Sequence, residues 1–186
     1  IAELLQKQDD ERIFVVTQAL RLGISAEKIH YITGYDMWFL KKIKNIVDLE
    51  ENLRRNNLTA ENVQLAKRYS MPDAVIAGFT NKTEEQVRQF RERLNIRPTF
   101  KMVDTCAAEF EAATPYYYSC YATEDEVKPL GSKSVIVLGS GPIRIGQGIE
   151  FDYCSVHSAW ALRHAGMNSI IVNNNPETVS TDFDTS

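Results

Sequence analysis

The sequence predicts a mixed fold class, in which an all-α helical domain is followed by a partial α/β Rossmann-like unit. Two observations carry this prediction. Apolar residues recur at spacings of three and four almost throughout residues 10–94, as on one face of an α-helix. From Ser134 onward the pattern becomes an apolar strand, a glycine-rich loop, a helix and a second apolar strand, which is the start of a doubly wound parallel sheet.

Six helices are predicted in the first part, the first from an apolar stripe that ends at Gly23 and the other five from a start signal and an apolar stripe. The start signals are N-cap residues or a proline, namely Ser25, Asp36, Thr59, Pro72 and Thr83, the last with Gln86 as a capping box. The residues expected to face inward are, helix by helix, Ile13, Val16 and Leu20; Ile29 and Ile32; Leu40, Ile43 and Val47; Val63, Ala66 and Tyr69; Val75, Ile76 and Phe79; and Val87, Phe90 and Leu94.

A weak internal repeat runs through these helices. A shift of 47 residues superposes Ile29 on Ile76 and the cap Asp36 on the cap Thr83. Two related helical hairpins would give this pattern, and so would two unrelated segments that share the helical period. The sequence leaves both interpretations open.

Residues 99–133 differ in kind from both flanks. They have little periodicity, a tyrosine cluster at Tyr116, Tyr117, Tyr118 and Tyr121, and an acidic run before Pro129. We predict a tether that lies along the surface of a neighbouring domain, because these aromatic residues are too many for a free linker.

The loop after the first predicted strand is the most informative local feature. It contains Gly139, Gly141, Gly146 and Gly148, so backbone N–H groups can approach an anion at the start of the following helix. The glycine spacing differs from the dinucleotide fingerprint, Asn173 stands where a ribose-binding acid is expected, and no GK[ST] follows for a P-loop. We predict an anion-binding loop and disfavour a dinucleotide-dependent enzyme. The alternative is that the glycines only make a tight turn.

Polar residues also follow the second predicted strand. Because the carboxyl ends of parallel strands meet at one edge of a sheet, Glu177 would face the same crevice as the glycine loop. We therefore expect Arg144, Glu150 and Glu177 to converge. The alternative is that Arg144 is a solvated loop charge and that Glu150 is an acid favoured by the helix dipole.

The composition is that of a packed protein and excludes several classes. Of the 186 residues, 44% are hydrophobic and 25% are charged. No apolar run approaches the roughly 20 residues that span a bilayer, and the N-terminus lacks the layout of a signal peptide. The three cysteines are far apart and in no metal-binding spacing. We expect a cytoplasmic protein with no membrane contact.

The charge is distributed unevenly. Residues 1–98 hold 16 basic and 14 acidic residues, a net of +2, whereas residues 99–186 hold 5 and 11, a net of −6. Neither part has the basic excess that binding to a phosphate backbone requires. The helix pair at 72–94 has the length of a helix-turn-helix, but Glu84 and Glu85 would face the phosphates. A helical DNA-binding or regulatory module is the alternative interpretation, and we expect no nucleic acid partner.

Three segments, in this order, resemble one protein family. They read VDTCAAEF at 103–110, GSGPIRIGQGIEFDYCSVH at 139–157 and NNNPETVSTDFDTS at 173–186. Together with YDMWFLKKI at 35–43, they resemble the large subunit of glutamine-dependent carbamoyl phosphate synthetase over nearly the whole chain. The resemblance implies an oligomerisation domain with a C-terminal tether at 1–126. It also implies a truncated pre-ATP-grasp domain, the start of the second synthetase half, at 127–186, so we expect an excised fragment.

The resemblance also implies a chemistry. In that family two ATP-dependent halves act in series, the first making carbamate from bicarbonate and ammonia and the second phosphorylating carbamate to carbamoyl phosphate. By resemblance, Arg144, Glu150 and Glu177 line the end of the passage that delivers carbamate. The full-length ligase would use ATP with Mg or Mn, and K, bind a glutaminase small subunit and self-associate through the helical domain. For this fragment alone we expect no catalytic residue, no cofactor, no metal and no activity.

Overall fold

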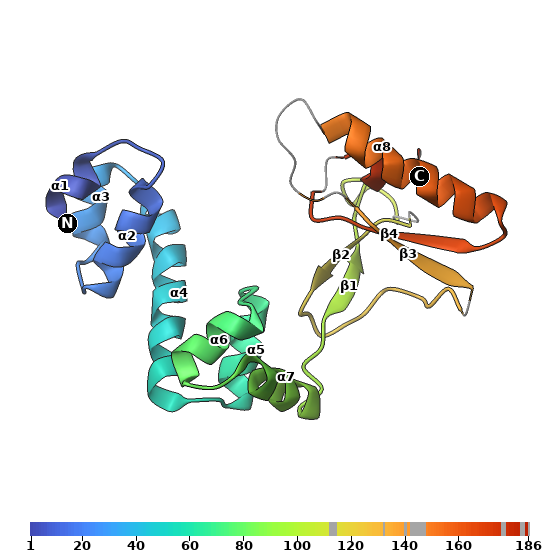
Figure 1. Ribbon diagram of the computed structural model, residues 1–186. Coiled ribbons are helices and arrows are strands. Elements are labelled where there is room, and N and C mark those ends of the chain that lie inside the picture. The colour runs from blue at the N-terminus through green and yellow to red at the C-terminus, as the bar shows by residue number, and fades with distance from the viewer. Residues whose placement is uncertain are drawn as a thin grey trace. The chain divides into compact units, whose positions relative to one another are not determined.

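The structure, a computed structural model, describes residues 1–111, 115–131, 133–139, 141, 148–175, 178–182 and 185, with the backbone alone for 148–151. The chain divides into two compact units, Ile1–Pro98 and Thr99–Ser186, which are treated one at a time below (Figure 1). The first unit is helical and the second holds two small sheets and a helix. The predicted fold class is therefore confirmed, while the domain boundary at residue 126 stays a prediction.

Seven helices form the first unit. They are α1 (Ala2–Gln6), α2 (Arg12–Arg21), α3 (Ala26–Thr33), α4 (Met37–Asn56), α5 (Ala60–Arg68), α6 (Asp73–Thr80) and α7 (Glu84–Arg93). Four predicted N-caps are confirmed, because a side-chain oxygen of each accepts a hydrogen bond from a backbone N–H of the first turn; these are Ser25, Asp36, Thr59 and Thr83. Thr83 and Gln86 form the predicted capping box. Pro72 is the residue before α6 rather than part of its first turn.

Two hydrophobic clusters make the core of this unit, and the long helix α4 contributes to both. The first cluster joins α1, α2, α3 and the first half of α4, with Val16, Ile29 and Leu40 fully buried. The second cluster joins the rest of α4 to α5, α6 and α7, around Leu53 and Ile76. The helices of this unit are thus held together through α4 (Figure 1).

Four residues of the predicted inward stripes lie outward instead. They are Ile13, Tyr69, Val75 and Leu94, which are 39–49% exposed. All four lie within three residues of a helix end, where fewer neighbouring residues can cover a side chain. The helical period identifies the inward face of a helix, but it does not show how far along the helix that face is covered.

The structure repeats at the spacing that the sequence predicts. The bounds of α3, moved by 47 residues, are those of α6, and the first residue of α4 likewise becomes the first residue of α7. Four pairs of equivalent core positions are 0% exposed in both copies, namely Val16 and Val63, Ala19 and Ala66, Ile29 and Ile76, and Leu40 and Val87. Agreement in helix ends and in side-chain burial goes beyond a shared period, and it favours two related helical hairpins.

Residues 99–133 contain a β-hairpin that the sequence did not predict. Its strands, β1 (Thr99–Met102) and β2 (Tyr117–Cys120), are antiparallel. Two of the clustered tyrosines, Tyr117 and Tyr118, belong to β2. Part of the aromatic cluster therefore forms a strand rather than a tether, and the segment groups with the second unit.

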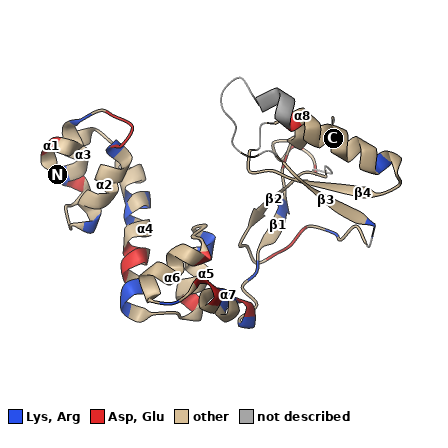
Figure 2. Cartoon of the chain, in the orientation of Figure 1, with Lys and Arg blue, Asp and Glu red and all other residues tan. Residues whose placement is uncertain are grey.

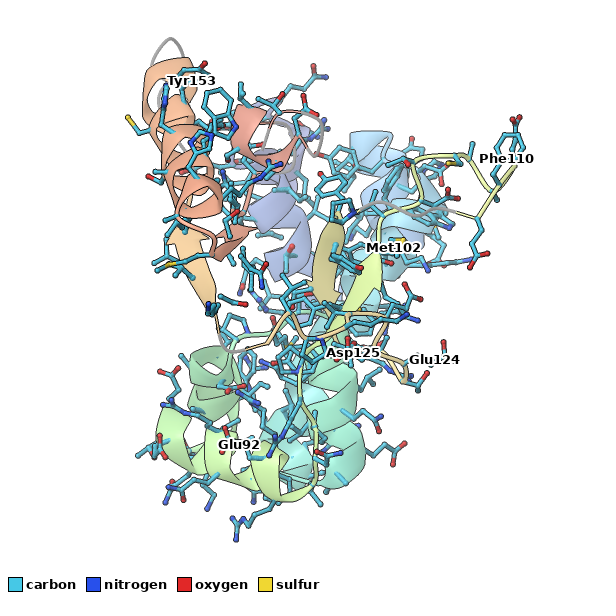
Figure 3. The ribbon with its side chains drawn as sticks, turned by 90° about the vertical axis from the view of Figure 1, so that its right-hand side faces the viewer. Glu92, Met102, Phe110, Glu124, Asp125 and Tyr153 are labelled. Carbon is cyan, nitrogen blue, oxygen red and sulfur yellow. The ribbon has the colours of Figure 1, made fainter. Side chains whose placement is uncertain are left out.

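The acidic run after β2 lies beside β1. The backbone N–H of Glu126 donates to the carbonyl of Phe100 at 2.9 Å, and the Lys101 ammonium donates to the Glu126 carboxylate at 2.7 Å. The hydrogen bond from Lys101 lowers the pKa of Glu126, and one from the backbone N–H of Met102 lowers it further. Figure 3 shows Glu124 and Asp125 on one side of Met102 and Phe110 on the other.

The predicted β-α-β unit is confirmed. Strands β3 (Ser134–Leu138) and β4 (Asn168–Val172) are parallel, and α8 (Gly148–His164) connects them. Helix α8 lies along this sheet, with Val156 and Ala159 fully buried (Figure 1). A short 3-10 helix, η1 (Val179–Thr181), follows β4. In the described parts of the chain, no helix has the length and apolar character needed to cross a membrane.

Candidate functional site

The strands β3 and β4 end side by side, and the residue after β3 is a glycine with little room for a side chain. The N–H of Gly139 donates to the carbonyl of Val172 at 2.8 Å, which continues the pairing of the strands. A Cβ on Gly139 would lie 2.7 Å from Cγ of Asn173, closer than such atoms approach. Two residues further on, Gly141 has a φ of +70°, a conformation that favours glycine. The predicted loop thus begins at two positions that other residues would strain.

Asn173 is the centre of a hydrogen-bonded network at this edge. Its Nδ2 atom lies 3.3 Å from Oδ1 of Asp152, 3.2 Å from Oγ1 of Thr178 and 3.4 Å from Oγ of Ser180. Its Oδ1 atom accepts a hydrogen bond from the backbone N–H of Asn175 at 3.3 Å. The network connects the end of β4 to η1 and to α8.

Asp152 is the buried carboxylate of this network, with 1% of its surface exposed. The backbone N–H of Ser180 donates to Oδ2 at 2.7 Å, and the Ser180 hydroxyl donates to Oδ1 at 2.6 Å. With Asn173, these three described donors are all neutral. Asp152 also lies near the N-terminal end of α8, where the helix dipole favours a negative charge.

The structure describes some of the predicted site residues and not others. Gly139 and Gly141 lie at the start of the loop, and Gly148 is the first residue of α8. The backbone of Glu150 belongs to α8, and its side chain lies outside the described residues, as do Arg144, Gly146 and Glu177. The convergence of the arginine and the two glutamates stays a prediction.

Asp152, Thr178 and Ser180 were not predicted from the sequence as site residues, and Asn173 was considered only as evidence against a dinucleotide site. One signal for Asp152 was present, because Asp152, Val156 and Ala159 are spaced four and three apart. An acid on the apolar stripe of its own helix is expected to be buried and to need hydrogen-bond donors. No local pattern indicates that Ser180, 28 residues later, supplies two of them.

A second buried polar cluster lies in the helical unit. The Asp73 carboxylate accepts hydrogen bonds from Nζ of Lys67 at 2.8 Å and from Nε of Arg91 at 2.7 Å. Burial raises the pKa of Asp73, but the bonds from Lys67 and Arg91 outweigh burial and hold it below its usual value. Because one carboxylate of α6 binds a cation from α5 and another from α7, we assign the cluster a structural role.

Metal ligands were not expected in this chain. Among the side chains that the structure describes, no three His, Cys, Asp or Glu residues gather as metal ligands do.

The fold and the site together define a class of protein, a helical domain followed by a Rossmann-like β-α-β unit with a polar site at the carboxyl edge of its strands. The family model for the carbamoyl-phosphate synthetase large chain, oligomerisation domain, matches residues 1–95. The family model for the carbamoyl phosphate synthase preATP-grasp domain matches residues 131–186. The chain belongs to the carbamoyl phosphate synthetase large-chain family.

A relative from Lachnoclostridium phytofermentans supports the same assignment. Its carbamoyl phosphate synthase large chain is 56% identical over 186 residues, which is 99% of this chain and 17% of that protein. The chain therefore spans about a sixth of the length of this relative. The comparisons give no support to the DNA-binding alternative.

Proposed function

We propose that this chain is part of a glutamine-dependent carbamoyl phosphate synthetase. The full-length ligase makes carbamoyl phosphate from bicarbonate, glutamine-derived ammonia and two molecules of ATP, for arginine and pyrimidine biosynthesis in the cytoplasm. The observation that carries the proposal is the 56% identity to a named large chain along 99% of this chain. The glutaminase small subunit, ATP with Mg or Mn, and K are assigned to the whole enzyme. The nucleotide and its ions would be held by parts of the large chain other than this one.

The helical part, placed at residues 1–126 with its tether, would mediate self-association. Trp38 and Phe39 of α4 are each 59% exposed, with ring centroids 5.0 Å apart. Figure 2 shows basic residues in the first part of α4, followed by acidic residues and then basic ones at its end. The acidic residues of α4 are already paired within the chain, Asp48 with Lys44 and Glu50 with Arg21. The proposal therefore rests on the exposed aromatic pair, which suits an interface.

The second part, placed at residues 127–186, would begin the carbamate-phosphorylating half. We assign the end of the carbamate passage to Arg144, Glu150, Glu177 and the glycine loop. Support comes from the hydrogen bonds between Asp152 and Ser180. In the sequence, Asp152 is two residues after Glu150, and Ser180 is three residues after Glu177. These bonds join α8, which contains the backbone of Glu150, to η1, which follows Glu177 in the sequence.

The types of residue at positions 144, 150 and 177 suit the delivery of carbamate, which is an unstable anion. Arg144 is permanently charged and stands in a glycine-rich stretch of the sequence, so it would stabilise carbamate. Glu150 and Glu177 would repel a bare anion, so they would order water or pair with Arg144. Carbamate decomposes in water, so a passage that shields it matters most for the second phosphorylation.

Arg144→Ala and Glu177→Ala in the full-length enzyme test this assignment. We expect carbamoyl phosphate formation to fall by about tenfold or more, while glutamine hydrolysis and bicarbonate-dependent ATP hydrolysis stay near wild type. The three reactions are assayed separately on each purified variant, with Lys128→Ala, outside the site, as the control. Equal loss in all three reactions would indicate misfolding. No loss in any of them would show that these side chains are solvated loop charges.

A further inference from the structure

Three segments meet at the buried network around Asp152. The first is the start of the glycine loop, where Gly139 leaves no room for a Cβ beside Asn173. The second is the beginning of α8, which carries Asp152. The third is the segment after β4, which Ser180 ties to the Asp152 carboxylate through both its backbone and its hydroxyl. One carboxylate thus joins the beginning of α8 to Asn173, which lies against Gly139, and to Ser180 after β4.

Packing alone does not explain a carboxylate at this position. Burying a charged group costs free energy even when it is hydrogen-bonded, and an apolar side chain would fill the space without that cost. What a carboxylate adds is direction, because it accepts all three hydrogen bonds and fixes the orientation of each donor. Both its oxygens are used, so a rotation or shift of the segment after β4 would break at least one bond.

We infer that Asp152 is a positioning residue for carbamate delivery, which it controls through Ser180 and Asn173. It acts by tying Ser180, which is three residues after Glu177 in the sequence, to the beginning of α8, which contains the backbone of Glu150. The inference rests on the proposed function of these glutamates, and it assigns no contact between Asp152 and carbamate.

The directions of these hydrogen bonds indicate which variants of Asp152 and Asn173 test the inference. In Asp152→Asn one oxygen becomes an NH2 group, which places a donor against the donors of Ser180 or Asn173. In Asn173→Asp a second carboxylate is placed about 3.3 Å from the first. The double variant Asp152→Asn/Asn173→Asp restores one carboxylate and one amide. The new amide can accept from the Ser180 N–H and donate to the new carboxylate.

The measurement is the amount of carbamoyl phosphate formed per bicarbonate-dependent ATP hydrolysed, in the full-length enzyme. We expect this ratio to fall by about tenfold or more in Asp152→Asn and in Asn173→Asp. It should return to within about threefold of wild type in the double variant, since the pairing of the two side chains is restored. The reverse reaction, in which carbamoyl phosphate and ADP give carbamate and ATP, needs no delivery and should change less than about twofold.

Two further variants keep the test decisive. Ser180→Ala removes one hydroxyl and leaves the backbone bond, so it is expected to fold and to lower the ratio by an intermediate amount. Asp182→Asn makes the same chemical change at an exposed residue of the same segment, and it should leave the ratio unchanged. Thermal unfolding of each variant identifies any that fail to fold.

The outcomes separate the inference from the function on which it rests. A lowered ratio with an intact reverse reaction, restored in the double variant, supports the positioning role. Folded Asp152→Asn and Ser180→Ala enzymes with a wild-type ratio, or with all reactions lowered equally, would overturn the inference even if Glu177→Ala lowers the ratio. If Glu177→Ala has no effect, the proposed carbamate passage itself is wrong, whatever the Asp152 variants do.

Discussion

Asp73 is a carboxylate held between two cations inside the helical unit. Its side chain is 10% exposed, and those of Lys67 and Arg91 are 7% and 14% exposed. Neither partner follows from sequence spacing alone, because Lys67 lies in α5 and Arg91 in α7. The sequence predicted the helices but not which of their charges would meet, since that depends on how the helices pack. The contact between Asp152 and Ser180 at the candidate site likewise depends on packing. The glycine-rich segment that begins at Gly139, in contrast, is visible in the sequence itself.

Asp73→Asn should destabilise this chain by about 3–5 kcal/mol at neutral pH, because it leaves a buried lysine and arginine without their carboxylate. The folded-state pKa of Asp73 is lowered, so its stabilising effect is present above the unfolded pKa of about 4. It is lost as the pH falls through the lower, folded value. Urea unfolding between pH 2 and 7 checks this. The prediction would be contradicted if the free energy of unfolding of the wild type fell no more steeply at low pH than that of the variant.

Gly139→Ala should destabilise the second unit by about 1–3 kcal/mol, because the new Cβ would overlap the Asn173 side chain. Gly78→Ala is the matched control, since Gly78 lies within α6 and a Cβ there meets nothing within 4 Å. That control should gain about 0.5–1 kcal/mol from the higher helix propensity of alanine. Unfolding curves of the two variants are compared with wild type. Wild-type stability of Gly139→Ala would show that Asn173 moves aside without cost.

At the level of elements, helices with a capping residue and an apolar stripe could be predicted from the sequence. Ser25, Asp36, Thr59 and Thr83 cap their helices as expected, because an N-cap acts within a few residues of its own position. The hairpin of β1 and β2 was missed. Each strand has four residues, and 14 residues separate them, so neither alternation nor a short turn indicates the pairing. Strand pairing over that distance depends on tertiary structure.

At the level of the whole molecule, the helical unit is expected to bring copies of the chain together. Trp38→Ala combined with Phe39→Ala should weaken self-association by about tenfold or more, because exposed aromatic residues often dominate an interface. Phe110→Ala, which removes an aromatic side chain that is 73% exposed in the second unit, is the control. Sedimentation velocity over a range of concentrations reports the association. A wild-type chain that stays monomeric at high micromolar concentration would contradict the expectation.

Glutamine-dependent carbamoyl phosphate formation by the full-length protein that contains this chain tests the proposed function. The purified protein, with its glutaminase subunit, is supplied with bicarbonate, glutamine and ATP, and carbamoyl phosphate and ADP are both quantified. We predict two ADP formed for each carbamoyl phosphate, and no turnover above background by the 186-residue chain alone. A full-length protein that forms no carbamoyl phosphate under these conditions, or an isolated chain that turns over, would contradict the account.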